Sequence, residues 1–110
     1  MVISLVELQA GTESRKAMLE VLRYTESTLR TNPTCLGCEV YEAVDKIGRV
    51  LYVEKWRTTE DLHRHIRSPL YLRILNAFDL AQQTPTISFH EVSATSSIEL
   101  IEELRRCNER

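Results

Sequence analysis

The stretch from residue 49 to residue 75 constrains the fold of this 110-residue chain more than any other segment. It opens with RVLYVEKW, in which aromatic and β-branched residues predict a β-strand from Arg49 to Trp56. Side chains alternate between the two faces of a strand, so Tyr52, Glu54 and Trp56 would share one face. A carboxylate between two aromatic residues on an inward face needs a partner, and we leave open whether an arginine of this subunit or of another supplies it.

A short helix is predicted directly after this strand. Thr58, followed three residues later by Asp61, resembles a capping box and would open a helix that ends near His65. We expect Ser68 to cap a second helical segment with Pro69 at its first position. The apolar stripe of that segment comprises Tyr71, Ile74, Leu75 and Phe78. The strand–helix junction therefore brings an aromatic ring, a carboxylate and an imidazole to one place.

Hydrophobic periodicity predicts the other elements of the chain. They are a strand at 2–9, a helix at about 12–30, strands at about 36–44 and 86–92, and a helix that begins near residue 96. The order βαββαβ is the ferredoxin-like plan, an α+β fold with a four-stranded antiparallel sheet and here an extra C-terminal helix. We expect one domain at 1–93 and a helical extension at 94–110. A helix of about a dozen residues is marginal alone, so it should dock on this subunit or on its neighbour.

The first strand has apolar residues on both of its faces. Val2, Val6 and Leu8 share one parity, while Ile3 and Leu5 share the other. A strand that is apolar on both faces is covered on both. Helices can cover one face, and a partner subunit is the simplest candidate for the other.

Composition narrows the range of partners. The net charge of −2 arises from 14 basic and 16 acidic residues that are scattered along the chain, which argues against nucleic-acid binding. No apolar run approaches the roughly 20 residues that span a bilayer, and the N-terminus lacks the features of a signal peptide. We therefore expect a cytoplasmic protein without membrane contact, and an odd count of three cysteines fits that location.

Two possible metal or redox motifs carry little weight. Cys35 and Cys38 have redox-motif spacing, but they open a strand instead of a helix, and we expect their thiols to point to opposite faces. Cys107 is distant in sequence, and His63 and His65 face away from each other on a helix. We predict no metal site.

The chain resembles the antibiotic-biosynthesis-monooxygenase family of the dimeric α+β barrel superfamily. Three motifs in order carry the resemblance: Gly37-Cys38 with Tyr41, Glu54-x-Trp56, and His65-x-x-Ser68-Pro69. The resemblance implies a homodimer whose sheets face each other, with a pocket between each sheet and its helices. It also implies oxidation of a quinol or polycyclic phenol by O₂ without flavin, haem or metal, so no cofactor is expected.

The resemblance implies that Trp56 lines the pocket and that His65 is the recurring helix histidine, and the hypothesis of a monooxygenase extends this to six site residues. The catalytic candidates are His65, Tyr52 and Glu54, and the substrate-binding candidates are Trp56, Tyr71 and Leu70. For His65, the residues alone also allow a structural role at the end of its helix, and for Trp56 they allow simple core filling.

The sequence departs from the family pattern at two informative places. Leu70 stands where a second histidine or another polar residue is frequent, and Tyr52 stands where one branch has a substrate-binding asparagine. Leu5 and Leu75 fall near the positions where haem-degrading relatives need an asparagine and a haem-ligating histidine, which disfavours haem degradation.

Two hypotheses follow. The first is a cofactor-independent monooxygenase that acts on a small aromatic substrate with O₂. The second is a non-enzymatic dimeric module that binds a small molecule or a partner protein, suggested by the apolar Leu70 and by the appended helix.

Overall fold

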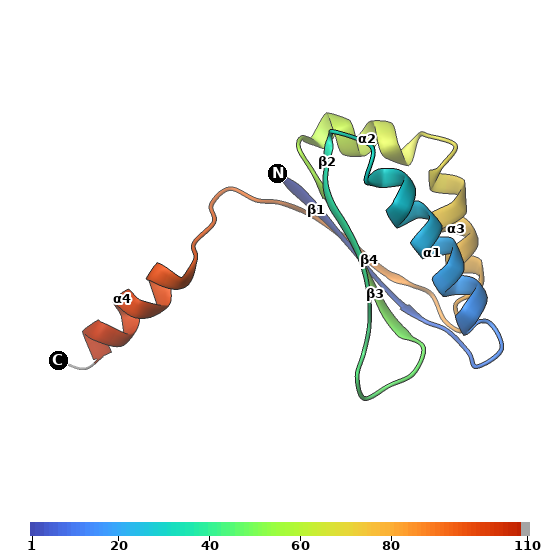
Figure 1. The fold of residues 1–110 in the computed structure, drawn as a ribbon, viewed down its shortest axis with the longest axis horizontal. Helices are drawn as coiled ribbons and strands as arrows, with labels where there is room; N and C mark the ends of the chain where they lie inside the picture. Colours follow the sequence, from blue (N-terminus) through green and yellow to red (C-terminus); the bar gives the residue numbers. More distant parts are fainter. Residues whose placement is uncertain (109–110) are drawn as a thin grey trace.

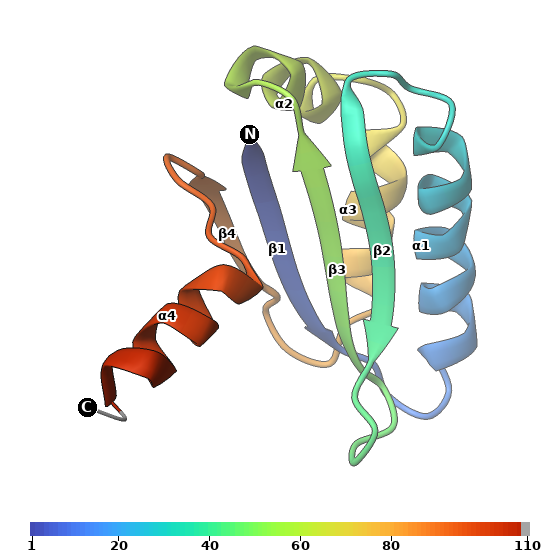
Figure 2. The same cartoon turned by 60° about the vertical axis from the view of Figure 1, so that its left-hand side comes forward.

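The computed structural model describes residues 1–108, which form one antiparallel sheet with three helices on one side and a fourth helix that stands apart (Figures 1 and 2). In chain order the elements are β1 (Val2–Gln9), α1 (Arg15–Leu29), β2 (Cys35–Glu42), β3 (Arg49–Trp56), α2 (Thr59–Ile66), α3 (Tyr71–Asp79), β4 (Thr86–Glu91) and α4 (Ile98–Asn108). The strands lie in the order β2-β3-β1-β4, and every pairing is antiparallel. The predicted βαββαβ order and ferredoxin-like fold are confirmed. None of the helices described is both long and apolar enough to cross a membrane.

The core lies between the sheet and the helices α1, α2 and α3. From β1 and β3, every second residue points into it, as their alternation predicts. The largest fully buried side chains are Trp56, Tyr52, Met18, Leu22, Ile74, Glu54, Val6, Val50 and Thr25. Tyr52, Glu54 and Trp56 therefore share one inward face, and Glu54 is a carboxylate inside a largely apolar core.

The opposite face of the sheet has no helix over it (Figure 2). Leu5 pairs with Val53 at its centre, and Ile3 and Leu51 lie on the same face; all four are only half-buried. Tyr41, which pairs with Leu51 across β2 and β3, is exposed. We call this surface the open face.

The start of α2 confirms the predicted cap. The Thr58 hydroxyl accepts a hydrogen bond from the backbone N–H of Asp61 at 3.1 Å and donates one to its carboxylate at 2.9 Å. Arg57 and Arg64 also donate to that carboxylate. The hydrogen bond from Thr58 and the charge of Arg57 lower the pKa of Asp61 below its ordinary value. The buried Asp61 is thereby kept charged at the N-terminus of α2, where the helix dipole favours an anion.

The predicted start of the next helix is wrong. The Ser68 hydroxyl donates to the backbone carbonyl of His65 at 2.6 Å instead of capping a following helix. Backbone hydrogen bonds form a turn from Ser68 to Leu70, and α3 begins at Tyr71. Ser68 therefore fastens the end of α2 beside His65.

The predicted stripe of α3 is correct in part. Tyr71 and Ile74 are buried, but Leu75 is exposed and Phe78 is only half-buried. Ala77 occupies the third buried position. The buried side of α3, which packs against α1, therefore differs in part from the predicted stripe.

The C-terminal helix α4 stands apart from the sheet domain (Figure 1). Every side chain described in it is exposed. The helix begins where its composition predicts, but it does not dock on the rest of its own chain.

An ion pair joins the start of α1 to the β2–β3 turn. Arg15 donates through Nε and Nη2 to the two carboxylate oxygens of Glu42, both at 2.7 Å, and the Gly48 amide donates to Glu42 at 2.8 Å. The hydrogen bonds from Arg15 and then from Gly48 lower the pKa of Glu42 to about 2. The turn residue Gly48 has a φ of 87°, which only glycine adopts easily.

We expect Glu42→Gln to remove a pH-dependent part of the stability. A carboxylate with a lowered pKa in the folded state stabilises the fold above its ordinary value of 4.5, and this contribution disappears as the pH falls toward about 2. In urea unfolding, the free energy of unfolding of wild type should exceed that of the variant clearly at pH 7 and only slightly at pH 2. Glu39→Gln, an exposed change on the same strand, is the control. Equal differences at both pH values would contradict the expectation.

Candidate functional site

A hydrogen-bonded cluster centred on Glu54 lies between β3 and α2. Tyr52, Glu54 and Trp56 project from β3, and His65 projects from the last turn of α2 to meet them. Glu54 Oε2 lies 2.6 Å from the Tyr52 hydroxyl and 3.0 Å from His65 Nε2, and Oε1 lies 3.0 Å from Trp56 Nε1. All four residues are buried, and Glu54 is only 1% exposed. Its partners are therefore these three side chains, and no arginine within residues 1–108 is among them.

The direction of each hydrogen bond follows from the donors. The indole N–H of Trp56 can only donate. The Cys38 thiol donates to the Tyr52 oxygen at 3.3 Å, and the Tyr52 hydroxyl donates to Glu54. Burial raises the pKa of Cys38 to about 12, and burial followed by the charge of Glu54 raises the pKa of Tyr52. Both groups therefore keep their protons at neutral pH, and Glu54 acts as the common acceptor.

This acceptor fixes the tautomer of His65. Because the Glu54 carboxylate accepts all its hydrogen bonds, neutral His65 carries its proton on Nε2 and donates it to Oε2. The lone pair of the imidazole is then on Nδ1. Every fully enclosed side-chain nitrogen or oxygen among the residues described has a hydrogen-bond partner, whereas Nδ1 of His65 has none there. Nδ1 is therefore not fully enclosed, although the His65 side chain is only 3% exposed.

A cleft of about 360 Å³ lies beside His65. It is bounded by the end of α1, the loop that leads into β2, helix α2 and the turn before α3. Its lining residues are Leu29, Asn32, Thr34, Asp61, Arg64, His65, Ser68 and Leu70. His65 thus borders a space large enough for a small ligand.

Two aromatic rings hold the imidazole in place. Trp56 stacks on His65 with ring centroids 4.6 Å apart and an interplanar angle of 29°. Tyr71 meets His65 edge-on at 5.2 Å and 83°, and burial raises the pKa of Tyr71, so it also stays neutral. The ring is fixed by stacking, by an edge contact and by a charged hydrogen bond.

The six predicted site residues are brought together, but in two layers. His65 and Leu70 line the cleft. Tyr52, Glu54 and Trp56 are 0–1% exposed and lie behind His65, and Tyr71 packs against its edge. These four support the imidazole from the core side.

Sequence reasoning missed Asn32, Thr34, Asp61 and Arg64 of the cleft. Asn32 Oδ1 accepts hydrogen bonds from the backbone N–H and the hydroxyl of Thr34, which shapes the loop between α1 and β2. That loop precedes Cys35, which pairs with Trp56. The ferredoxin-like plan was a signal for this, because two strands that follow each other without a helix between them pair as neighbours, and this brings the loop near the junction.

The predicted orientation of the cysteine pair, with thiols on opposite faces, is wrong. A bulge between Cys35 and Gly37 adds one residue to β2, so Cys35 pairs with Trp56 and Cys38 with Glu54. Both cysteines therefore lie on the helix-facing side, and both are free thiols. In residues 1–108 there is no group of three or more His, Cys, Asp or Glu side chains able to hold a metal ion.

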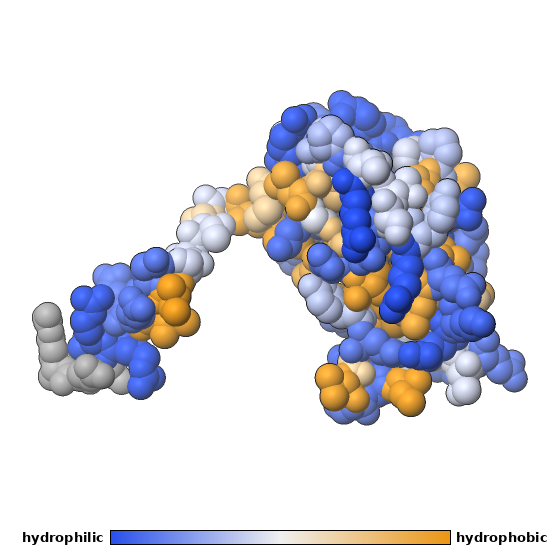
Figure 3. Space-filling view, viewed as in Figure 1, coloured by the Kyte–Doolittle hydropathy of each residue, from blue (hydrophilic) through white to orange (hydrophobic). Residues whose placement is uncertain are grey.

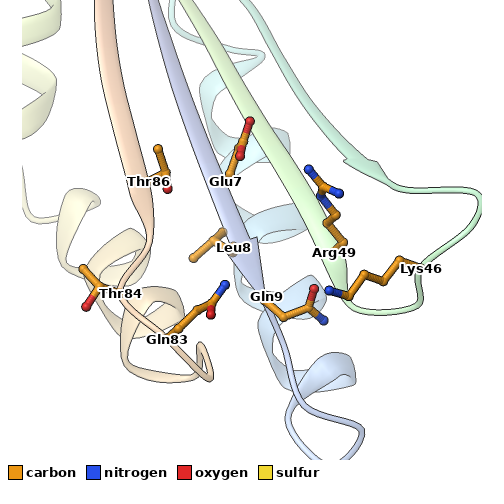
Figure 4. A pocket seen from close by; sticks show the side chains of 8 residues that line it. All are labelled: Glu7, Leu8, Gln9, Lys46, Arg49, Gln83, Thr84 and Thr86. Atoms are coloured by element: carbon orange, nitrogen blue, oxygen red, sulfur yellow. The ribbon is translucent and has the colours of Figure 1, made fainter.

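A second cavity, of about 140 Å³, lies at the other end of the strands (Figure 4). Its lining includes Glu7, Gln9, Lys46, Arg49 and Thr86 but none of the six predicted site residues. It offers charged and polar groups without an imidazole or a thiol, so we place the candidate site at the His65 cleft.

Comparison with known proteins points to one family. The sequence profile of the family described as antibiotic biosynthesis monooxygenase matches residues 1–77. No curated protein matches the sequence at a significant level.

Several solved structures share the fold. A Deinococcus radiodurans protein, provisionally named an antibiotic biosynthesis monooxygenase, is 25% identical with a TM-score of 0.80; the match covers 89% of this chain and 98% of that one. Rv0793 from Mycobacterium tuberculosis is 21% identical with a TM-score of 0.77, over 87% and 98% of the two chains. A Nitrosomonas europaea protein with the same provisional name is 17% identical with a TM-score of 0.76, over 86% and 100%.

We expect the tautomer of His65 to depend on Glu54. In Glu54→Gln the amide NH₂ can donate to Nε2, which would move the imidazole proton to Nδ1. Nitrogen-15 NMR of the histidine ring should report an Nε2–H tautomer in wild type and an Nδ1–H tautomer in the variant. An Nδ1–H tautomer in wild type would contradict the assignment.

The same cluster predicts a stability effect. Glu54→Ala would leave the donors of Tyr52, Trp56 and His65 without their acceptor, and we expect a loss of about 3–5 kcal/mol in the free energy of unfolding. The isosteric Glu54→Gln should lose clearly less free energy of unfolding. Chemical denaturation of wild type and both variants would measure the differences.

Proposed function

The chain belongs to the antibiotic biosynthesis monooxygenase family, and on that premise we propose that it oxidises a small quinol or polycyclic phenol with O₂. One observation carries the proposal: Nε2 of His65 lies 3.0 Å from the buried Glu54 carboxylate, and the same histidine borders a cleft. This is the arrangement of a general base oriented by a carboxylate.

The first step is removal of the substrate's phenolic proton. A phenol in the cleft would give its proton to Nδ1, and the imidazolium that forms would lie 3.0 Å from the Glu54 carboxylate. Trp56 and Tyr52 keep that carboxylate oriented through their hydrogen bonds. In this proposal His65 is the catalytic base and Glu54 is its orienting partner, while Tyr52 acts only through Glu54.

The oxidation itself uses the electrons of the substrate. A phenolate is electron-rich enough to reduce O₂, and an anthrone illustrates the balance: its CH₂ becomes C=O with one oxygen atom, and the other leaves as water with the two hydrogens. No external reductant, flavin, haem or metal is needed for this balance. The protein contributes deprotonation, orientation and exclusion of water.

The cleft lining suits such a substrate. Leu29 and Leu70 supply apolar contact for a ring, and Asn32, Thr34 and Ser68 are polar groups that could meet its oxygens. Its volume of about 360 Å³ lies near the lower end of the usual range for ligand pockets, which favours a compact molecule.

A binding module without turnover is the second candidate. Leu70, on the cleft wall, adds apolar contact where a polar residue would serve catalysis, and this favours retention of a ligand. Turnover separates the two functions, because a binding module would hold an aromatic compound unchanged.

We also infer a homodimer joined through the open face. Ile3, Leu5, Leu51 and Val53 form an apolar centre that no helix of the chain covers. A second copy with the same face would bury it symmetrically, in line with the paired sheets of the family.

We expect His65→Ala to abolish substrate-dependent O₂ uptake. Loss of a general base costs about 10²–10⁴-fold in kcat/KM. A panel of quinols and anthrones, monitored with an oxygen electrode and by product mass, would measure it. His63→Ala is the matched control, since His63 lies two residues away on α2 and is exposed. O₂ uptake no faster than in buffer would refute the proposed monooxygenase activity. Equal rates for the two variants would refute the role of His65 as its base.

We expect Val53→Glu to yield monomers. It would place a charge at the centre of the open face, which a paired sheet cannot solvate. Sedimentation velocity would compare it with Leu72→Glu, the same kind of change at a residue of α3 that is 62% exposed. A wild-type protein that is monomeric at micromolar concentration would refute the dimer.

A further inference from the structure

Helix α4 is amphipathic, although every side chain described in it is exposed. At 100° per residue, Leu100, Ile101, Leu104 and Cys107 fall on one side, with Ile98 at its margin. We call this side the apolar arc. The other side of the helix carries Glu99, Glu102, Glu103 and Arg106. Ile98, Leu100, Ile101 and Leu104 are 44–62% exposed, so the arc has no cover within the chain.

An uncovered helix of this length needs a partner. Isolated helices shorter than about 12–15 residues are marginal in water, and α4 has 11 residues. Its stability must come from burial of the apolar arc.

The position of α4 indicates where that partner lies. The hydrophobic side chains of α4 gather on the side turned toward the sheet domain (Figure 3). Helices α1 and α3 lie on the far side of the sheet, so α4 and the open face border the same space (Figure 1). Two apolar surfaces thus face one space that the chain itself leaves unfilled.

The connection to α4 has a suitable reach. Six residues, 92–97, join the edge strand β4 to α4, and an extended chain of that length spans about 20 Å. Sheets packed face to face lie about 10 Å apart. The connection can therefore carry α4 past the edge of a second sheet that lies against the open face.

Helix α4 lies outside the part of the chain that the family profile matches, which is residues 1–77. The match to the Deinococcus radiodurans structure covers 98% of that chain and 89% of this one, and the share of this chain left over is about the length of α4.

We propose that α4 is an arm that packs its apolar arc against a second copy of this chain. The proposal rests on the sheet pairing inferred above. When a second copy lies on the open face, its domain fills the space that the apolar arc borders, and two-fold symmetry gives each copy an arm on the other. The arms then add contact area that the paired sheets alone do not provide.

The test uses full-length variants that change only α4. In Ile101→Glu/Leu104→Glu the apolar arc is charged, and in Glu99→Gln/Glu103→Gln, the matched control, the polar side changes instead. Sedimentation equilibrium measures the dissociation constant of each protein. We expect the first variant to weaken the dimer at least 100-fold, because both arms lose two apolar contacts, and the control to match wild type.

Cys107 provides a second readout. It lies on the apolar arc and is exposed in the single chain, whereas Cys38 is buried with its pKa raised to about 12 and Cys35 is half-buried with its pKa raised by burial. Cys107 should therefore be the fast-reacting thiol. We expect a thiol reagent to label it slowly in concentrated wild type, and at least tenfold faster after dilution or in the Ile101→Glu/Leu104→Glu variant.

The outcomes separate the two proposals. A monomeric wild type overturns the sheet pairing and the arm together. A wild-type dimer whose dissociation constant is unchanged in Ile101→Glu/Leu104→Glu overturns the arm alone. Protection of Cys107 that is independent of protein concentration means that α4 folds back on its own sheet, and this also overturns the arm.

Discussion

The buried carboxylate of Glu54 is the constraint on which the site depends. A charge in the core is tolerated only when its oxygens are hydrogen-bonded, and here Tyr52, Trp56 and His65 supply the donors. Two of these come from β3 at alternate positions, and the third requires α2 to end directly above the strand. The Thr58 cap, at the start of α2, and the Ser68 hydroxyl, at its end, hold the helix in that place. The imidazole of His65 at the cleft is therefore held in place by its hydrogen bond to the Glu54 carboxylate, which lies on its core side.

The outer surfaces of the domain carry apolar side chains that the chain itself does not cover. Strict alternation in β1 and β3 gives the core one set of side chains and leaves the other set on the open face. Because this second set contains Ile3, Leu5, Leu51 and Val53, the sheet is apolar on both sides but covered on one. The apolar arc of α4, at a distance from the sheet, also consists of exposed apolar side chains without cover. One second copy of the chain would resolve both.

Alternation and capping made most of the fold predictable from sequence. The bounds of β1 and β3, the inward face with Glu54, and the start of α2 all follow from local patterns. The partners of Glu54 did not, since they depend on where α2 crosses the strand. The bulge at Cys35 and Gly37 reverses a local rule, and only the pairing of β2 with β3 reveals it. The prediction that Ser68 caps the next helix was wrong because a serine hydroxyl can bond to the backbone before it as well as after it. A pattern of residue types does not distinguish the two.

The cost of the Glu54 cluster argues that it serves more than stability. Buried charged groups can often be replaced by apolar residues of similar volume with no loss of stability, and sometimes with a gain. Val50, on the same face of β3, shows that this core accepts an aliphatic side chain. A buried carboxylate that orders Tyr52, Trp56 and His65 has a desolvation cost that an aliphatic side chain in the same space would not have. What it adds is an imidazole that Glu54 holds in place and that borders a cleft. In the proposed function, that imidazole is the group that takes the proton of the substrate.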